Sequence, residues 1–203
     1  MNLGQQSEIQ NQIVYYDNIA YLINEEENTA GVFNSEGSHA QKIIIPRSIE
    51  HGSKKYDVTS ILMNAFNKSQ IEIILFASDS KLQTICEKAF NKSSIKSIQI
   101  PSSVTSIGEE AFSNCYQLEV IEIPEDSKLQ TIGKGAFYFT AIKSLKIPSE
   151  LVELKEGWCR DTRNLTTITL SAKNPRYCFS DSKMILGKSR IEQSNYDCLV
   201  FCV

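Results

Sequence analysis

The sequence predicts a solenoid in which repeated units stack around a parallel β-sheet. Two observations carry this prediction. The dipeptide Ala-Phe recurs four times at intervals of 22 to 25 residues, and a second pattern, apolar-x-x-apolar-x-apolar, recurs between its copies. One unit of this length cannot bury its own apolar side, whereas stacked units can. We therefore expect like side chains of successive units to form continuous files in the interior.

The Ala-Phe positions predict a file of aromatic side chains, formed by Phe66, Phe90, Phe112, Phe137 and Trp158. The last member comes from Gly157-Trp158, which aligns with Ala-Phe if one residue is missing before Gly157. Apolar residues also precede each Ala by seven and four positions, which predicts two more interior files: Val58/Ile61, Leu82/Ile85, Val104/Ile107 and Leu129/Ile132.

The second pattern predicts strands, because its last two apolar positions alternate with polar ones as in a half-buried strand. Four of the five prolines follow it directly: Pro46, Pro101, Pro124 and Pro148. Proline has no N–H to donate to a ladder, so it ends each strand. The copies read Ala40/Ile43/Ile45, Ile71/Ile74/Phe76, Ile95/Ile98/Ile100, Leu118/Ile121/Ile123, Ile142/Leu145/Ile147 and Leu165/Ile168/Leu170.

These residues resemble the BspA-like leucine-rich repeats, a class found in surface antigens of protozoa and bacteria. The resemblance is carried by residues 118–124 (LEVIEIP), 104–112 (VTSIGEEAF) and 114–115 (NC), and it covers residues 40–171. It implies a leucine-rich-repeat solenoid of the α/β horseshoe type, dominated by β-structure. The parallel sheet would lie on the concave face, with turns and short helical segments on the convex face.

The resemblance also implies a role in adhesion or macromolecular recognition at the cell surface or after secretion, without catalytic residues. The family's glycine is present at Gly108 and Gly133. Three matching positions have another residue instead, namely Leu62, Cys86 and Lys155. The turn at these three positions therefore need not have positive φ.

The N-terminal part, residues 1–40, does not follow the repeat. Short strands over 13–16, 19–23 and 29–33 predict a β-hairpin cap that shields the first unit from water. Residues 41–171 contain about six units of 21 to 25 residues. The first of these units is enlarged by an expected loop over 51–57.

The C-terminal part, residues 172–203, predicts a β-hairpin followed by a strand over 198–203. That strand is apolar and reaches the end of the sequence. An unprotected apolar edge invites pairing with another chain. Two interpretations stay open, a truncated chain and a homodimer formed through this strand.

The search for chemistry is negative. The two histidines, His39 and His51, fall in predicted loops, and no hydrolase, phosphate-binding or dinucleotide motif is present. The six cysteines contain no Cys-x-x-Cys pair, which favours buried free thiols over a zinc site. The sequence therefore predicts no enzyme activity, no catalytic residue, no metal and no cofactor.

Composition restricts the partner and the location. A net charge of −3 without any basic block argues against nucleic acid or an anionic membrane surface. The apolar runs are too short for a membrane-spanning helix. No signal peptide is visible at the N-terminus. A cytoplasmic location is thus the alternative to the cell-surface or secreted location implied by the resemblance.

The outward positions of the predicted sheet alternate in charge from strand to strand. We expect one ion-pair ladder along Glu72, Lys96, Glu119 and Lys143, and a second row in which Glu122 pairs with Lys146. Such a nearly neutral face does not suit a polyanionic ligand.

Four apolar side chains are expected to point outward from the same sheet: Ile44, Ile73, Leu75 and Val120. They form a candidate surface for a protein or extracellular-matrix partner. The alternative is that the N-terminal cap folds over Ile44 and Ile73. The predicted function is a non-enzymatic protein-binding or adhesion module, and the alternative is an intracellular leucine-rich-repeat scaffold.

Overall fold

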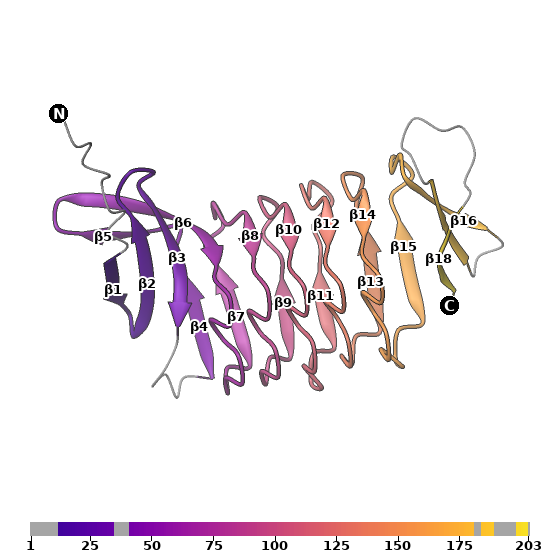
Figure 1. Ribbon diagram of the computed structural model, residues 1–203, viewed down its shortest axis with the longest axis horizontal. Coiled ribbons are helices and arrows are strands. Elements are labelled where there is room, and N and C mark those ends of the chain that lie inside the picture. The colour runs from indigo at the N-terminus through magenta and orange to yellow at the C-terminus, as the bar shows by residue number, and fades with distance from the viewer. Residues whose placement is uncertain (1–11, 35–40, 181–183, 189–197, 203) are drawn as a thin grey trace, which may run out of the picture.

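The computed structural model describes residues 12–34, 41–180, 184–188 and 198–202, and these residues form a solenoid of stacked β-turns and strands. The units follow one another along the long axis, with the N-terminal strands at one end and the C-terminal strands at the other (Figure 1). Within the described residues the secondary structure is strand and turn, without helix. The expected short helical segments are therefore absent from this part of the chain.

The apolar-x-apolar segments form the first face of the solenoid. Its strands are β4 (Lys42–Ile45), β7 (Ile73–Phe76), β9 (Ser97–Gln99), β11 (Val120–Glu122), β13 (Ser144–Ile147) and β15 (Thr167–Leu170). The strands β4, β7, β9 and β11 form one parallel sheet, and β13 pairs in parallel with β15 beyond it. Their register keeps like residues level, so that buried Ile43, Ile74, Ile98 and Ile121 form one file.

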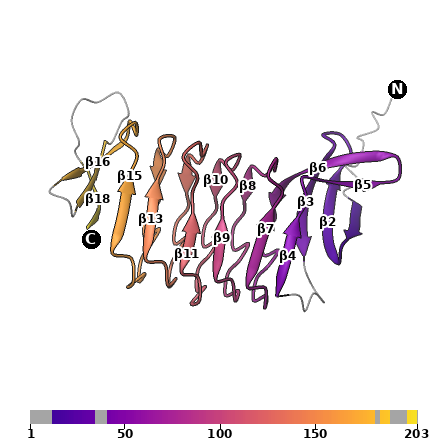
Figure 2. The same ribbon diagram turned by 180° about the vertical axis from the view of Figure 1, so that it is seen from behind.

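A second face, which we did not predict as a sheet, runs along the opposite side. It contains β6 (Lys54–Ile61), β8 (Thr84–Ile85), β10 (Ser106–Ile107), β12 (Thr131–Ile132) and β14 (Glu153–Leu154), paired in parallel. Most of these strands have only two residues. Their isoleucines are buried in the same apolar core as the file of the first face. The two rows of strands can be followed in Figures 1 and 2.

The Ala-Phe segments form the connecting turns, and they are held by a ladder of their own. The backbone N–H of Phe66 donates to the carbonyl of Ala89 (2.7 Å), and that of Phe90 donates to Ala111 (2.8 Å). Each turn has two residues with positive φ, such as Asn64 (60°) and Lys68 (59°). A right-handed helix needs negative φ throughout, so these positions exclude the predicted helical segments.

The family's glycines are required for close packing rather than for positive φ. A Cβ on Gly133 would lie 2.5 Å from the carbonyl carbon of Gly108, which only a shift of the backbone could relieve. Positive φ occurs two residues later, at Glu110 and Gly135. The link that we expected between the family's glycine and positive φ is therefore wrong.

The aromatic file is confirmed for its four phenylalanines. Neighbouring rings of Phe66, Phe90, Phe112 and Phe137 stack at centroid distances of 5.1, 5.0 and 5.7 Å, with interplanar angles of 21° or less. All four side chains are buried. Offset stacking at such distances adds to the free energy gained from burial alone.

The fifth ring, that of Trp158, comes from a different position of the repeat than the four phenylalanines. Ile132 of β12 lies opposite Leu154 of β14, and Trp158 follows Leu154 by four residues, as Ala136 follows Ile132. Trp158 thus occupies the Ala place, and the assumption of a missing residue before it is wrong.

The backbone ladder determines this register, since the N–H of Phe137 donates to the carbonyl of Trp158 at 2.8 Å. The buried Cys159 takes the Phe place. Cysteine is much smaller than phenylalanine, and the indole meets Phe137 edge-on, at 6.3 Å and 84°. The file therefore ends in a T-shaped contact.

The N-terminal strands extend the second face. An antiparallel meander of β1 (Gln12–Tyr16), β2 (Ile19–Asn24) and β3 (Thr29–Asn34) pairs through β3 with β6. Asp17 and Asn18, both with positive φ, form the two-residue turn between β1 and β2. The expected loop over 51–57 is wrong, because β5 (Ser48–His51) and β6 form a hairpin there.

At the other end, two side chains close the edge of the second face. The Tyr177 hydroxyl accepts a hydrogen bond from the N–H of Leu154 (2.9 Å) and donates to the carbonyl of Val152 (3.2 Å). The Asn174 amide donates to the carbonyls of Pro148 (2.7 Å) and Leu151 (2.8 Å). These polar groups replace the strand that another unit would have supplied.

Beyond this point an antiparallel sheet contains β16 (Tyr177–Ser180), β17 (Met184–Gly187) and β18 (Cys198–Cys202). The homodimer through the C-terminal strand and the division of the chain at residues 40 and 171 stay predictions.

Candidate functional site

The four apolar residues predicted to point outward are on the surface of the first face. The exposed fractions are 60% for Ile44, 38% for Ile73, 41% for Leu75 and 45% for Val120. Their neighbours along the strands are buried, as the alternation of a half-exposed strand requires.

The described N-terminal strands do not cover this surface. They belong to the sheet of the second face, and they leave Ile44 and Ile73 exposed. The alternative in which the cap folds over these two side chains is therefore wrong for the part of the chain that the structure describes.

Three of the four side chains are close neighbours. Ile44 lies opposite Leu75 in the ladder between β4 and β7, and Ile73 points to the same side as Leu75, two residues earlier on β7. Val120 is separated from Ile73 by Ser97 of β9, two strand spacings or roughly 10 Å away. We call Ile44, Ile73 and Leu75 the apolar patch.

The charged side chains of this face form separate ion pairs rather than one ladder. Glu72 pairs with Lys96 and Glu119 with Lys143, each at 2.6 Å. Among the described residues no ion pair links these two. Hydrogen bonding to the Lys143 ammonium lowers the pKa of Glu119. These pairs leave the middle of the face polar and nearly neutral.

The second predicted row is wrong. Lys146 pairs with Glu125, which lies in the turn after β11, and not with Glu122. The turn places Glu125 within reach of the lysine side chain, and sequence alternation alone could not show this. Glu122 is left exposed on β11.

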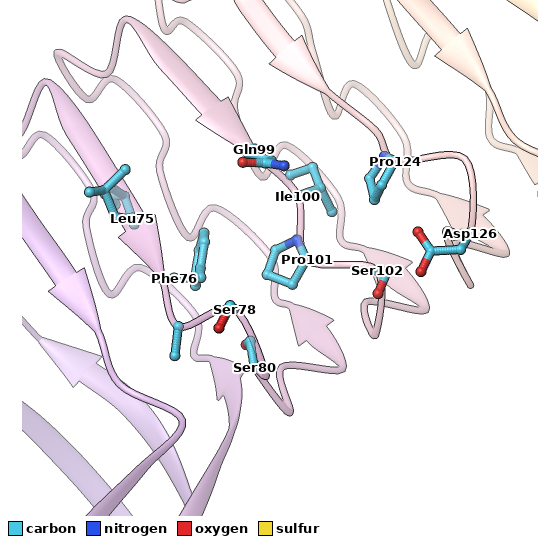
Figure 3. A pocket seen from close by; sticks show the side chains of 12 residues that line it. Leu75, Phe76, Ser78, Ser80, Gln99, Ile100, Pro101, Ser102, Pro124 and Asp126 are labelled. Carbon is cyan, nitrogen blue, oxygen red and sulfur yellow. The ribbon is translucent and has the colours of Figure 1, made fainter.

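A hollow of about 390 Å³ lies beside the apolar patch, at the ends of β7 and β9. Leu75 and Phe76 line one end of it, Pro101 lies in the middle, and Asp126 lies at the other end (Figure 3). The hollow opens where the second unit has Ala77 in place of the proline that follows the strand in four other units.

The structure explains this substitution. The N–H of Ala77 donates to the carbonyl of Ile45 at 3.1 Å, which a proline could not do. A ring is thereby missing from the file formed by Pro46, Pro101 and Pro124. The hollow was not predicted from the sequence, although Ala77 and Ser171 are the two positions where the proline that follows the other four strands is absent.

The described residues offer little for chemistry. In these ranges no cluster of three His, Cys, Asp or Glu side chains could hold a metal ion, and no helix has the length and apolar character of a membrane span. His51 is exposed at the end of β5, and His39 lies outside the described residues. Cys86, Cys115, Cys159 and Cys178 are free thiols, whereas the side chains of Cys198 and Cys202 lie outside the description.

Comparison with known proteins agrees with this geometry. The model of the BspA type leucine-rich repeat region matches residues 59–185 in six copies. The chain belongs to the BspA-type leucine-rich-repeat family. The resemblance seen in the sequence is thus confirmed. None of the curated protein sequences matches the chain.

Several solved structures share the fold. The pneumococcal vaccine antigen PcpA is similar with a TM-score of 0.69 and 22% identity over 88% of this chain. The T. pallidum leucine-rich repeat protein TpLRR has a TM-score of 0.58 and 20% identity, and the match covers 79% of this chain and 84% of that chain. A leucine-rich cell surface protein from Faecalibacterium prausnitzii A2-165 has a TM-score of 0.51 and 21% identity, and the match covers 88% of this chain and 59% of that chain.

The chain spans about half of the PcpA chain that it matches, 54%. At such low identity these likenesses show a common fold and nothing of the partners. The family by itself indicates a repeat module of the protein-binding kind.

Proposed function

We propose that this BspA-type solenoid is a non-enzymatic adhesion or recognition module that binds a protein through the apolar patch of its first face. The observation that supports this proposal is that Ile44, Ile73 and Leu75 form adjoining exposed apolar side chains on a face whose other outward positions, apart from Val120, are polar or charged. Exposed apolar groups of this kind, rimmed by polar residues, are typical of protein–protein interfaces.

We further propose a location at the cell surface or outside the cell, with a protein or an extracellular-matrix component as the partner. The support is the family together with two similar structures, of which one is a vaccine antigen and one a cell surface protein. The same geometry needs no cofactor, and a packed interior of apolar files provides no site for catalysis.

A single observation favours the alternative, an intracellular scaffold that uses the same patch. The four cysteines whose side chains are described are free thiols, as in proteins of reducing compartments. Mass measurement of the native protein before and after reduction and alkylation separates the two. Disulfides among the six cysteines favour the outside, and six free thiols favour the scaffold.

The patch is tested with Leu75→Glu and a matched control, Thr169→Glu. Thr169 is exposed at the same outward register position on β15, far along the solenoid from the patch. Both variants add one negative charge to an exposed strand position, so both should fold as the wild type does.

Each protein is immobilised, and the proteins retained from native extracts and matrix preparations are quantified by mass spectrometry. We expect one or more proteins that the wild type and Thr169→Glu retain equally, and that Leu75→Glu retains about tenfold less. Equal retention by all three would contradict the patch as the binding surface, and so would the absence of any protein retained above background.

A further inference from the structure

We propose that the hollow beside the apolar patch receives an arginine or lysine side chain of the partner protein. This inference rests on the proposed function and specifies the chemistry of the partner at that surface. Leu75 belongs to both features, because it is part of the patch and lines the hollow. A partner segment lying across the patch would therefore reach the hollow with a neighbouring side chain.

The size and the lining of the hollow suit a long side chain with an apolar stem. Its volume of about 390 Å³ equals that of about a dozen water molecules. Leu75, Phe76, Pro101 and Pro124 supply apolar surface along its length. The methylene stems of lysine and arginine pack on such surface while the charged head remains at the polar end.

The charge of the lining determines the sign of the guest. Asp126 is the one charged residue among the twelve that line the hollow. Figure 3 shows its carboxylate turned toward Ser102. An anionic guest would be repelled by this carboxylate, and a neutral one would leave it without a partner.

Asp126 also differs from the acids around it. Asp79 pairs with Arg47 at 2.9 Å, Glu125 pairs with Lys146, and Glu119 pairs with Lys143. Among the described residues no lysine or arginine lies within ion-pair distance of Asp126. The fold thus neutralises these three carboxylates, whereas Asp126, like the exposed Glu122 of β11, is available to a cation from outside, and Asp126 is the one of the two that lines the hollow.

Polar groups of the lining can add hydrogen bonds to a bound cation, and Ser102 lies beside Asp126 (Figure 3). Ser78, Gln99 and Ser102 line the hollow, and their oxygens can accept hydrogen bonds from N–H donors. A planar guanidinium has donors for a carboxylate and for further acceptors at once, which makes arginine the better of the two guests.

The test uses n-butylguanidinium chloride as the probe, titrated into the full chain labelled with ¹⁵N and followed by NMR. Pentanoate, which has an apolar stem with a negative head, and n-pentanol, which is neutral, serve as comparison probes. The variant Asp126→Asn removes the charge. Glu156→Gln is the matched control, since it removes an exposed carboxylate from the last unit.

We expect saturable shifts of the backbone amides of Phe76, Ala77, Ser78 and Ser102 with n-butylguanidinium, the same for Glu156→Gln, and affinity lower by about tenfold for Asp126→Asn. A second variant, Ala77→Leu, should fill the hollow and abolish the shifts. The spectra themselves report whether each variant is folded.

The proposal is overturned if the wild type shows no saturable shift at these amides, if Asp126→Asn binds equally well, or if pentanoate or n-pentanol binds as tightly. Such a result leaves the apolar patch untouched, because the Leu75→Glu comparison does not depend on the probe. Conversely, binding of the probe by a chain whose patch retains no protein would disprove the proposed function and retain the cation-binding hollow.

Discussion

The inward and outward side chains of the first-face strands differ in how regularly they repeat. The inward file stays aliphatic from β4 to β11, with Ile43, Ile74, Ile98 and Ile121. The outward row consists of the residues that directly follow this inward file. It is apolar in β4 and β7, at Ile44 and Leu75, and polar in β9 and β11, at Gln99 and Glu122. An interior file has to keep the same volume in each unit, whereas an exposed position does not contribute to the stack. Changes in the outward row can therefore serve binding without disturbing the fold.

The largest loss of stability is expected for a substitution in the middle of the aromatic file. Phe112 is fully buried, with Phe90 at 5.0 Å on one side and Phe137 at 5.7 Å on the other. Phe112→Ala should lower the free energy of unfolding by about 3–5 kcal/mol, as other buried aromatic truncations do. Tyr116→Ala, at a ring that is 67% exposed, should cost about 0.5 kcal/mol or less. Urea unfolding measures both, and equal midpoints for the two variants would contradict the file.

A smaller loss is expected where two backbones approach each other. Gly133→Ala would place a Cβ at 2.5 to 2.7 Å from three backbone atoms of Gly108 and Glu109, so the free energy of unfolding should fall by about 1–3 kcal/mol. Gly52→Ala is the matched control, because open space surrounds Gly52 and only its φ of +62° opposes a side chain, at about 1 kcal/mol. Thermal unfolding should rank the two in this order, and the reverse ranking would show that close packing is not the reason for the glycine.

The buried thiols should make stability depend on alkaline pH. Burial raises the pKa of Cys115 from 9.0 to about 11 and that of Cys159 to about 12. The unfolded thiols ionise near their ordinary pKa, while the folded ones stay neutral. Stability is therefore complete below about pH 9 and decreases as pH rises through 9 to 11, by up to about 1.4 kcal/mol per pH unit for each thiol. Urea midpoints measured from pH 7 to 11 test this, and a slope unchanged in Cys115→Ala would contradict the contribution of that thiol.

The sequence was sufficient for the strands of the first face and for the four stacked phenylalanines, because these residues recur at fixed positions. It was insufficient for the second face, since two-residue strands such as Thr84–Ile85 leave no alternation to detect. Paired positive-φ residues, such as Lys88 and Lys92, excluded the helical segments, and lysine gives no warning of a left-handed conformation.

The candidate site was predicted in part for similar reasons. Alternation alone identified Ile44, Ile73 and Leu75 as outward, and their exposure agrees with this. The grouping of three without Val120 required the register, which places Ser97 between Val120 and Ile73. The hollow required knowledge of how the turns after β7 and β9 lie, and the repeat pattern does not give the path of these turns.

The most direct measurement compares two adjacent residues of β7 that point in opposite directions. Ile74 is 2% exposed and lies in the inward file, whereas Leu75 is 41% exposed and belongs to the apolar patch. Urea unfolding should show a loss of about 2–5 kcal/mol for Ile74→Ala and of about 0.5 kcal/mol or less for Leu75→Ala. Equal losses would contradict the account, because Leu75 would then contribute to the fold and would not be free for a partner.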